Sequence, residues 1–336
     1  MNLVGKKVLV TGSGGFIGSH LAERLAKLGC RVVALTHYDS RPDRSNLEFL
    51  TPETLAELDV RPGDVRDPMF MLEVTKGCQV VFHLAALIGI PYSYLAPSSY
   101  VDTNIKGTMN VLQACLAAGV ERLVHTSTSE CYGTAQYTPI DEAHPLCAQS
   151  PYSATKIGAD HIALSYHRAF GTPVVVLRPF NTYGPRQSAR AVIPTIISQL
   201  LAGERRIKLG SAHPTRDFSF VSDTVRGFAR AAVASEIVGE TINIGSGFEI
   251  SIGDTAALIA EILNVTIAIE TDEARVRPSS SEVERLFAGI GKAEKLLDWR
   301  PLFAAREGFK RGIVETIAWF SEPANLARYK HDQYNI

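Results

Sequence analysis

The feature that most restricts the fold of this chain is a glycine-rich turn near its N-terminus. Residues 8–10 are a short apolar run, and residues 11–18 read Thr-Gly-Ser-Gly-Gly-Phe-Ile-Gly. A helical pattern with leucines on one face follows, and residues 31–35 have the composition of a second strand. A buried strand, a glycine turn, a helix and another strand form a βαβ unit, which predicts a parallel sheet.

Three glycines of this turn have the spacing of a dinucleotide-binding loop. Gly12 permits a tight turn, Gly15 lets the backbone approach a pyrophosphate, and Gly18 lets the helix pack closely on the strand. The N–H groups at the start of the helix, with Phe16 and Ile17, would face the phosphates. The string alone is a weak signal, but its place between a buried strand and a helix favours dinucleotide binding.

The end of the second strand bears on which nicotinamide cofactor is bound. An acidic residue usually binds the adenosine ribose there, but the expected position falls near Thr36, and Asp39 lies further along. Arg41 and Arg44 follow; they could bind the 2′-phosphate of NADP or be ordinary loop charges. The residues leave NAD and NADP open, and analogy with the fold favours NAD.

Strands and helices continue to alternate through the first half of the chain. Residues 58–60, 80–84 and 122–127 read as strands, and residues 101–116 as a helix. This alternation predicts a doubly wound parallel Rossmann sheet, which binds its ligands at the carboxyl ends of the strands. The cofactor-binding candidates at these ends are Asp64, Val65, Leu84, Ala85 and Ala86.

From about residue 180 the alternation becomes irregular, and this predicts a smaller, interleaved α/β lobe for the substrate. Residues 217–232 and 241–244 read as segments that return to the first lobe. We therefore expect a Rossmann domain of residues 1–178 plus about 217–262. The substrate lobe would comprise about 179–216 plus 263–336.

Composition narrows the class of partner. Hydrophobic residues make up 46% of the 336 residues and the net charge is −1, as in a globular protein without a basic face. We therefore expect no nucleic-acid or membrane partner. The five cysteines are scattered without a CxxC pair, so no metal site or disulfide framework is predicted, and a cytoplasmic location is expected. No apolar run is long enough for a signal peptide or a membrane span.

Tyr152 and Lys156 are candidate catalytic residues. They are four positions apart, so on a helix they share a face. A phenol has a pKa of about 10 in water, and a nearby ammonium and a cationic nicotinamide would lower it. Tyr152 could then take a proton from a substrate hydroxyl that Thr128 also binds. A YxxxK pair alone is a weak signal; the upstream glycine turn makes it meaningful.

The order of these motifs resembles that of the extended short-chain dehydrogenases. The shared segments are residues 11–18, 63–65, 83–86, 128–130, 152–156, 178–185, 216–218 and 243–247. The resemblance covers nearly the whole chain, and the family includes sugar-nucleotide epimerases, decarboxylases and 4,6-dehydratases. Within it the chain is most similar to dehydratases of the legionaminic acid pathway, through residues 90–94, 187–194 and 281–285.

The resemblance implies a nucleotide-sugar substrate and several further roles. Lys156 would also hold the nicotinamide ribose. Asn181 and Arg277 would approach the diphosphate, and Arg216 the nucleotide, although each could instead be a surface residue. The helices around residues 98–118 and 152–170 would form the bundle of a homodimer.

Glu130 points to one reaction among those of the family. A 4-epimerase has no use for a carboxylate here, whereas a dehydratase needs one to remove the C5 proton once C4 is oxidised. The alternative is a carboxylate that caps the following turn. In many dehydratases an acidic residue precedes this glutamate. In this chain the position is occupied by Ser129, as in GDP-sugar dehydratases and UDP-glucuronate decarboxylases. The group that protonates the leaving hydroxyl is therefore unassigned, and Glu130 itself is one candidate.

The sequence thus predicts a sugar-nucleotide 4,6-dehydratase, a hydro-lyase, acting on a nucleotide-linked N-acetylhexosamine such as N-acetylglucosamine. A UDP-glucuronate decarboxylase and a nucleotide-sugar 4-epimerase are the enzymatic alternatives. A cofactor-binding regulator without turnover is the alternative from another class, against which Tyr152 and Lys156 argue, since a sensor could lose either.

Overall fold

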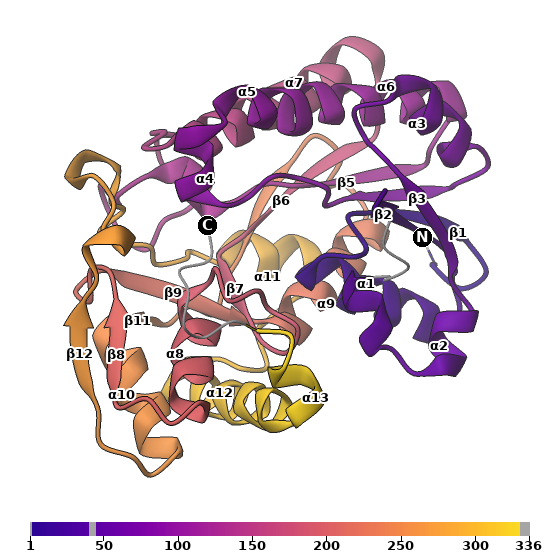
Figure 1. Cartoon of the computed structure of the whole chain (residues 1–336). Helices are drawn as coiled ribbons and strands as arrows, with labels where there is room; N and C mark the ends of the chain where they lie inside the picture. Colours follow the sequence, from indigo (N-terminus) through magenta and orange to yellow (C-terminus); the bar gives the residue numbers. More distant parts are fainter. Residues whose placement is uncertain (1, 40–44, 330–336) are drawn as a thin grey trace.

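The computed structural model describes residues 2–39 and 45–329. Seven strands form a central parallel sheet in the order β10-β6-β5-β4-β1-β2-β3 (Figure 1). Chain order reverses between β1 and β4, which is where doubly wound sheets bind ligands. The expected Rossmann fold is confirmed. The strands are β1 (Lys7–Thr11), β2 (Arg31–His37), β3 (Asp59–Gly63), β4 (Val80–His83), β5 (Arg122–Thr126), β6 (Val174–Pro179) and β10 (Thr241–Ile244).

Helices cover both faces of this sheet (Figure 1). One face carries α3 (Pro68–Thr75), α6 (Gly107–Ala118) and α7 (Pro151–Phe170). The other carries α1 (Phe16–Lys27), α9 (Val221–Val233) and α11 (Gly291–Leu297). Short helices in the connections are α2 (Pro52–Ala56), α4 (Ile90–Leu95) and α5 (Pro97–Tyr100). The helix expected over residues 101–116 begins as a π-helical turn (Val101–Lys106) that leads into α6.

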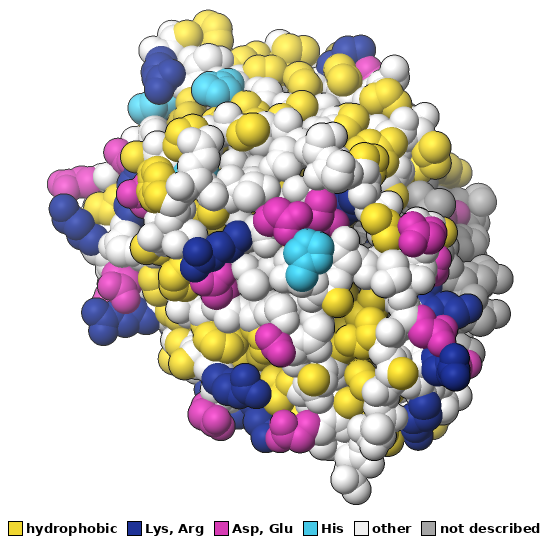
Figure 2. Space-filling model, turned by 90° about the vertical axis from the view of Figure 1, so that its left-hand side faces the viewer, with side chains coloured by type: hydrophobic (Ala, Val, Ile, Leu, Met, Phe, Trp, Pro, Cys, Tyr) yellow, Lys and Arg dark blue, Asp and Glu magenta, His cyan; other side chains and the backbone are white. Residues whose placement is uncertain are grey.

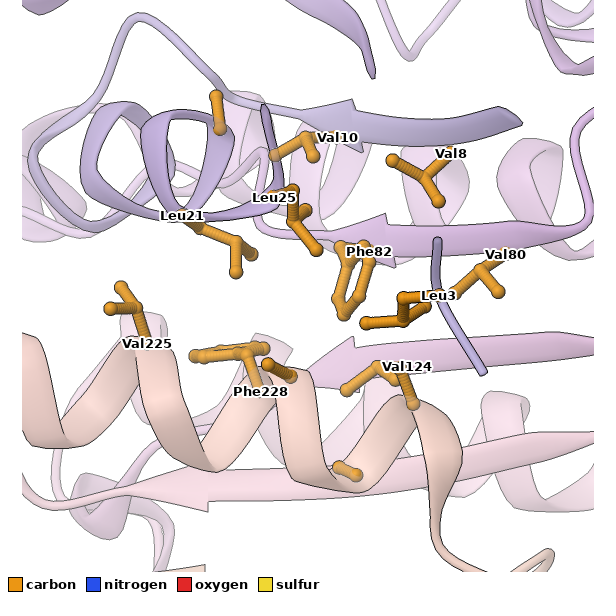
Figure 3. Close-up of a cluster of buried hydrophobic side chains, with 14 of the residues drawn as sticks. Leu3, Val8, Val10, Leu21, Leu25, Val80, Phe82, Val124, Val225 and Phe228 are labelled. Atoms are coloured by element: carbon orange, nitrogen blue, oxygen red, sulfur yellow. The ribbon is translucent and has the colours of Figure 1, made fainter. Parts of the chain in front are cut away.

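The alternation of side chains along β1 explains why its apolar run is continuous. Val8 and Val10 point into the core beneath α1 and α9, which also contains Leu25 and Phe228 (Figure 3). Leu9, between them, points into the opposite core beneath α3, α6 and α7. A strand buried on both faces has no polar side, and each such side chain contributes about 1.5–3 kcal/mol to folding.

The second lobe has its own sheets and its own core. Tyr183, Phe218 and Phe309 pack at its centre, with the rings of Phe218 and Phe309 stacked 5.7 Å apart. Its strands are β7 (Asn181–Tyr183), β9 (Thr215–Phe220) and β11 (Glu249–Ser251) in one sheet, and β8 (Arg206–Leu209) and β12 (Ala268–Thr271) in another. Its helices are α8 (Val192–Leu201), α10 (Ile252–Ile262), α12 (Ala305–Ser321) and α13 (Pro323–Leu326).

Two segments pack differently from the expected division of the chain. Helix α10 buries Ala256 and Ile259 in the second core, although we placed residues up to 262 in the Rossmann domain. Leu297 and Trp299 pack into the Rossmann core, although we placed them in the substrate lobe. Helical periodicity shows that a face is buried but does not show which core buries it.

Charged and hydrophobic side chains are mixed on the surface that Figure 2 shows. On the side of the molecule where β8 and β12 lie, acidic and basic side chains are interspersed among hydrophobic ones (Figure 2). Within the described ranges, no helix combines the length and the apolar character that crossing a membrane requires.

Candidate active site

A cleft of about 840 Å³ runs along the carboxyl edge of the central sheet. It brings together every predicted site residue except Arg216, which lies in an adjoining pocket of about 280 Å³. The predicted residues that line the cleft are Gly12, Gly15, Phe16, Ile17, Gly18, Thr36, Asp64, Val65, Leu84, Ala85, Ala86, Thr128, Ser129, Glu130, Tyr152, Lys156, Asn181 and Arg277. Residues from distant parts of the sequence therefore share one site, and their individual roles stay predictions.

The glycine turn forms a cradle that only small residues permit. Gly12 has a φ of +74°, and a Cβ there would lie 2.8 Å from the backbone N of Ala85. A Cβ on Gly18 would lie 2.1 Å from the carbonyl oxygen of Gly12. Helix α1 starts at its N-cap Gly15, which provides no side-chain cap for the first N–H groups of the helix. This geometry fits a dinucleotide pyrophosphate.

The cofactor-selecting end of β2 is only partly described. Thr36 is buried and lines the cleft beside His37, whereas Asp39 is exposed. Arg41 and Arg44 lie outside the described residues. The acidic residue that does line the cleft nearby is Asp64, whose carboxylate is bound by the Arg66 guanidinium at 2.5–3.0 Å. That hydrogen bonding lowers the pKa of Asp64.

A buried hydrogen-bond chain fixes the end of β4. The Thr11 hydroxyl accepts from the backbone N–H groups of Leu84 and Ala85, both at 3.1 Å, so it donates to His83 Nδ1 at 2.9 Å. His83 Nε2 then donates to the Thr108 hydroxyl at 3.0 Å. Burial holds the pKa of His83 well below its usual value, so the ring is neutral. In the sequence, His83 was only one residue of the shared segment 83–86, and its place in this hydrogen-bond chain was not predicted.

Helix α7 places Tyr152 in its first turn. Ser150 caps the helix by accepting from the backbone N–H of Ser153, and Ser153 completes a capping box. Tyr152 is buried beside Tyr100, with the ring centres 6.3 Å apart. Burial raises the pKa of the Tyr152 phenol, and a hydrogen bond with the Thr128 side chain lowers it only in part. The sequence prediction concerns a phenol beside a cationic nicotinamide as well as Lys156, and that lowering of the pKa stays a prediction.

Lys156 lies one turn further along α7 and is almost fully buried. Its ammonium donates to the carbonyl oxygen of Thr126 at 2.6 Å, at the end of β5. The buried ammonium is thus fixed at the same strand end that carries Thr128.

A tight turn after β5 holds Glu130 in the cleft. Thr128 caps the 3-10 turn Ser129–Tyr132, accepting from the Glu130 N–H at 3.3 Å. Tyr132 anchors this turn, because its hydroxyl donates to Asn243 Oδ1 at 2.8 Å. Glu130 is 8% exposed, yet its carboxylate makes no hydrogen bond to any other residue in the part of the chain that the structure describes. It lines both the cleft and the adjoining pocket.

The adjoining pocket contains the three predicted substrate-binding residues. It also contains two charged residues that were not predicted as site residues. Arg216 Nη2 lies 3.2 Å from Glu282 Oε1, and Arg277 Nη1 lies 3.7 Å from the same oxygen. Asn181 Oδ1 is buried and has no hydrogen-bond partner among the residues that the structure describes. The missed residues are Glu282 and Arg190, which belong to segments 281–285 and 187–194 that carried the narrower resemblance.

A glycine cradle and a buried tyrosine–lysine pair at the edge of a doubly wound sheet define a dehydrogenase-type site. The chain belongs to the GDP-mannose 4,6-dehydratase family, whose model matches residues 9–312. The resemblance to extended short-chain dehydrogenases is thereby confirmed.

Similar proteins catalyse several reactions. The dTDP-glucose 4,6-dehydratase of Actinoplanes sp. is 33% identical, over 94% of this chain and 97% of the relative. The UDP-N-acetyl-α-D-glucosaminuronate decarboxylase of Bacillus cytotoxicus is 32% identical, over 95% and 99%. The UDP-glucuronic acid 4-epimerase of Bacillus cereus was solved with UDP-4-deoxy-4-fluoro-glucuronic acid and NAD. It has a TM-score of 0.85 at 28% identity, with 94% of this chain and 99% of that chain covered. The family is that of enzymes acting on nucleotide sugars.

Proposed function

We propose that this protein is an NAD-dependent sugar-nucleotide 4,6-dehydratase. The observation that carries the proposal is Glu130, a buried carboxylate that faces the cleft and makes no hydrogen bond to any other described residue. A purely structural carboxylate in such a place would be expected to bind an N–H or hydroxyl group. A general base has to keep its oxygens available for the proton that it removes.

NAD would lie along the glycine turn and the ends of β4 and β5. Gly12, Gly15 and Gly18 would receive the pyrophosphate, and Leu84, Ala85 and Ala86 would lie against the nicotinamide half. The preference for NAD over NADP is supported by similar structures that contain NAD, including the Bacillus cereus epimerase. When bound, NAD supplies an acceptor for the C4 hydride and returns that hydride to C6.

The chain's own residues then handle the protons. Burial raises the pKa of Tyr152, so the phenol keeps its proton until a positive charge is placed beside it. As a phenolate, Tyr152 takes the proton of the C4 hydroxyl, while Thr128 orients that hydroxyl. The C5 proton of the resulting 4-keto sugar is acidic, and Glu130 removes it as hydroxide leaves C6. Glu130, now protonated, passes this proton directly or through the Ser129 hydroxyl to the departing hydroxide, which leaves as water, and C5 takes a proton from solvent when the hydride is returned to C6.

We propose a nucleotide-linked N-acetylhexosamine as the substrate. The diphosphate would bind at the adjoining pocket beside Asn181 and Arg277, and Arg216 in the same pocket would approach the nucleotide. The choice of sugar is supported by the narrower resemblance, because residues of segments 90–94, 187–194 and 281–285 line these two cavities.

A decarboxylase is the second candidate. Ser129 stands where many dehydratases have an acid, and the same replacement occurs in UDP-glucuronate decarboxylases. The decarboxylase relative at 32% identity supports the same alternative. This candidate requires a carboxylate at C5 of the sugar, which an N-acetylhexosamine lacks. A 4-epimerase is the third candidate, and it gives Glu130 no chemical task.

Mass spectrometry of the products separates these reactions. Purified protein is incubated with UDP-, GDP- and dTDP-linked hexoses, N-acetylhexosamines and uronic acids. A dehydratase product is lighter by one water, a decarboxylase product by carbon dioxide, and an epimer keeps its mass. In heavy water, the dehydratase should also place deuterium at C5. Interconversion of epimers without deuterium uptake would overturn the proposal.

Glu130→Gln should separate oxidation from elimination. The amide keeps the shape of the side chain but does not accept the C5 proton. Addition of substrate should still produce the absorbance of a dihydronicotinamide, while the 4-keto-6-deoxy product is released slowly. Turnover at nearly the wild-type rate would return Glu130 to a structural role.

We also propose a cytoplasmic homodimer. Apolar side chains are exposed along the two helices that the resemblance places in a dimer bundle, among them Val101, Met109, Leu116 and Phe170. All five cysteines are free, in keeping with a reducing compartment. Sedimentation velocity would test the dimer, and a monomer at micromolar concentration would contradict it.

A further inference from the structure

A buried polar cluster lies behind Lys156 and is not part of the proposed chemistry. At its centre is Asp160, one helical turn beyond Lys156 on α7 and 2% exposed. One of its oxygens, Oδ2, accepts from the Ser127 hydroxyl at 2.5 Å and from Arg178 Nη2 at 2.7 Å. The other, Oδ1, accepts from His125 Nε2 at 3.2 Å. Three elements, α7, β5 and β6, therefore meet at one carboxylate.

The cluster also fixes the strand end that forms the active site. The Ser127 hydroxyl, which donates to Asp160, also accepts a hydrogen bond from Arg178 Nε at 3.1 Å. The backbone N–H of Ser127 donates to the Leu177 carbonyl at 2.8 Å. Ser127 lies between Thr126, whose carbonyl binds Lys156, and Thr128, which faces Tyr152. A displacement of Ser127 would therefore move the partners of both catalytic side chains.

The Lys156 ammonium has little else to stabilise its charge. It is 4% exposed, and its hydrogen bond to the Thr126 carbonyl is the only one that it makes among the described residues. Burial lowers the pKa of Lys156, and the Asp160 carboxylate raises it. A buried ammonium without a counter-charge loses its proton readily.

The other titratable groups around Lys156 do not supply that counter-charge. His125 on β5 and His83 on β4 are neutral, because burial lowers the pKa of each ring. Burial raises the pKa of the Cys131 thiol to about 12. Burial likewise keeps Tyr152 protonated, and Arg178 on β6 is a cation. Asp160 is thus the anion that balances this buried group of charges.

We propose that Asp160 is a positioning residue that keeps Lys156 protonated in the active site and, through Ser127, holds the end of β5 in place. This inference rests on the proposed roles of Tyr152 and Lys156, although its first test needs no substrate. If Lys156 lost its proton, it would have fewer N–H groups to donate to a ribose and would no longer favour the Tyr152 phenolate. Activity would then be lost from the alkaline side.

The first test titrates Lys156 directly, by NMR of its side-chain nitrogen in protein labelled with ¹⁵N-lysine. The Lys156 signal is assigned by its absence from Lys156→Met. In Asp160→Asn, the midpoint of the titration should fall by about one pH unit or more, the usual effect of losing a close counter-charge. In Arg178→Gln, which breaks the same ion pair but leaves the carboxylate beside Lys156, the midpoint should not fall.

These outcomes separate charge from structure. A midpoint in Asp160→Asn equal to that of the wild type would overturn the proposal, as would equal decreases in both variants. Breaking a buried ion pair can prevent folding. The double variant Asp160→Asn/Arg178→Gln removes both buried charges and supplies a folded alternative, and its Lys156 midpoint should also fall.

The second test is the pH profile of kcat/KM on whichever sugar nucleotide turns over. In Asp160→Asn the alkaline limb should move to lower pH, whereas a merely structural defect would lower the rate equally at every pH. A shifted NMR midpoint with an unshifted limb would contradict the link to catalysis. If no sugar nucleotide turns over, the proposed function fails, and the NMR titration still decides whether Asp160 controls the charge of Lys156.

Discussion

The two sides of the cleft are built from different materials. The proposed cofactor side consists of backbone groups and small residues, such as the glycines at 12, 15 and 18 and the segment 84–86. The proposed substrate side consists of charged side chains from separate segments, with Arg190, Arg216, Arg277 and Glu282 around one pocket. A backbone cradle suits a ligand shared by a whole family, whereas side chains can be exchanged as substrates change.

The largest expected effect comes from the residue that serves both sides. Tyr152→Phe deletes one hydroxyl and little packing, so turnover should fall by about 10²–10⁴-fold, the usual contribution of a general acid–base group. Steady-state rates and NAD binding by fluorescence are measured side by side, and NAD binding should be retained. A rate within a few-fold of the wild type would remove Tyr152 from the mechanism.

The cofactor side should be intolerant of even one methyl group. A Cβ on Gly18 would lie 2.1 Å from the Gly12 carbonyl oxygen, so Gly18→Ala has to displace the turn. Overpacking of this kind costs about 1–3 kcal/mol of folding free energy. We expect the variant to be purified without NAD and to unfold at lower urea concentration. Gly77→Ala is a control, because a Cβ at Gly77 meets no atom within 4 Å, although its positive φ adds some strain. Normal NAD content in Gly18→Ala would show that the turn is not the cradle.

This contrast explains what the sequence could predict. The strand, the glycine turn and the helix are contiguous, and local rules of conformation fix their geometry, so the sequence predicted which of these residues line the cleft, while their roles stay predictions. On the proposed substrate side, Glu282 approaches Arg216 although the two are 66 positions apart in the chain, and no local pattern encodes such a contact. The role of Asp160 was missed for the same reason, since its partners His125 and Arg178 come from two other elements.

The deep burial of Tyr152, which raises the pKa of its phenol, could not be predicted from the sequence for a different reason. Sequence spacing showed that Lys156 shares its helix face, but it did not show how deeply both side chains are buried. Burial raises the pKa of the Tyr152 phenol and lowers the pKa of the Lys156 ammonium, and helical spacing shows neither effect.

A contact between the two sides should make stability depend on pH. The loop after β7 is tied to α1 by a hydrogen bond from His20 Nε2 to the Pro185 carbonyl at 2.9 Å and by an ion pair from Arg186 to Glu23 at 2.7 Å. Burial and the charge of Arg186 lower the pKa of His20 from 6.5 to about 4. Below pH 6.5 the unfolded chain therefore binds a proton that the folded chain does not, so stability falls as pH falls towards 4.

His20→Gln keeps a donor near Pro185 but removes the titration. Between pH 7.5 and pH 5, the wild type should lose about 2 kcal/mol more unfolding free energy than His20→Gln, as linkage to one such histidine requires. Urea unfolding of both proteins at the two pH values gives this difference. Identical losses would show that His20 does not titrate as its surroundings indicate.

The smallest expected effect concerns one cation on the substrate side. Arg190 lines both the cleft and the adjoining pocket, at the junction where Glu130 and Asn181 also lie, and it makes no ion pair with the described residues. A cation in that position should bind an oxygen of the substrate, and a hydrogen bond from a charged donor contributes about 1.5–3 kcal/mol. Because Arg190 is largely exposed, we expect the lower end of that range, a roughly tenfold higher KM for Arg190→Ala with little change in kcat. Arg206→Ala, an exposed arginine on β8 paired with Glu270, is the matched control and should leave both constants unchanged. A fall in kcat without a change in KM would place Arg190 in the chemical step, and no change in either constant would leave substrate binding to Arg216, Arg277 and Asn181.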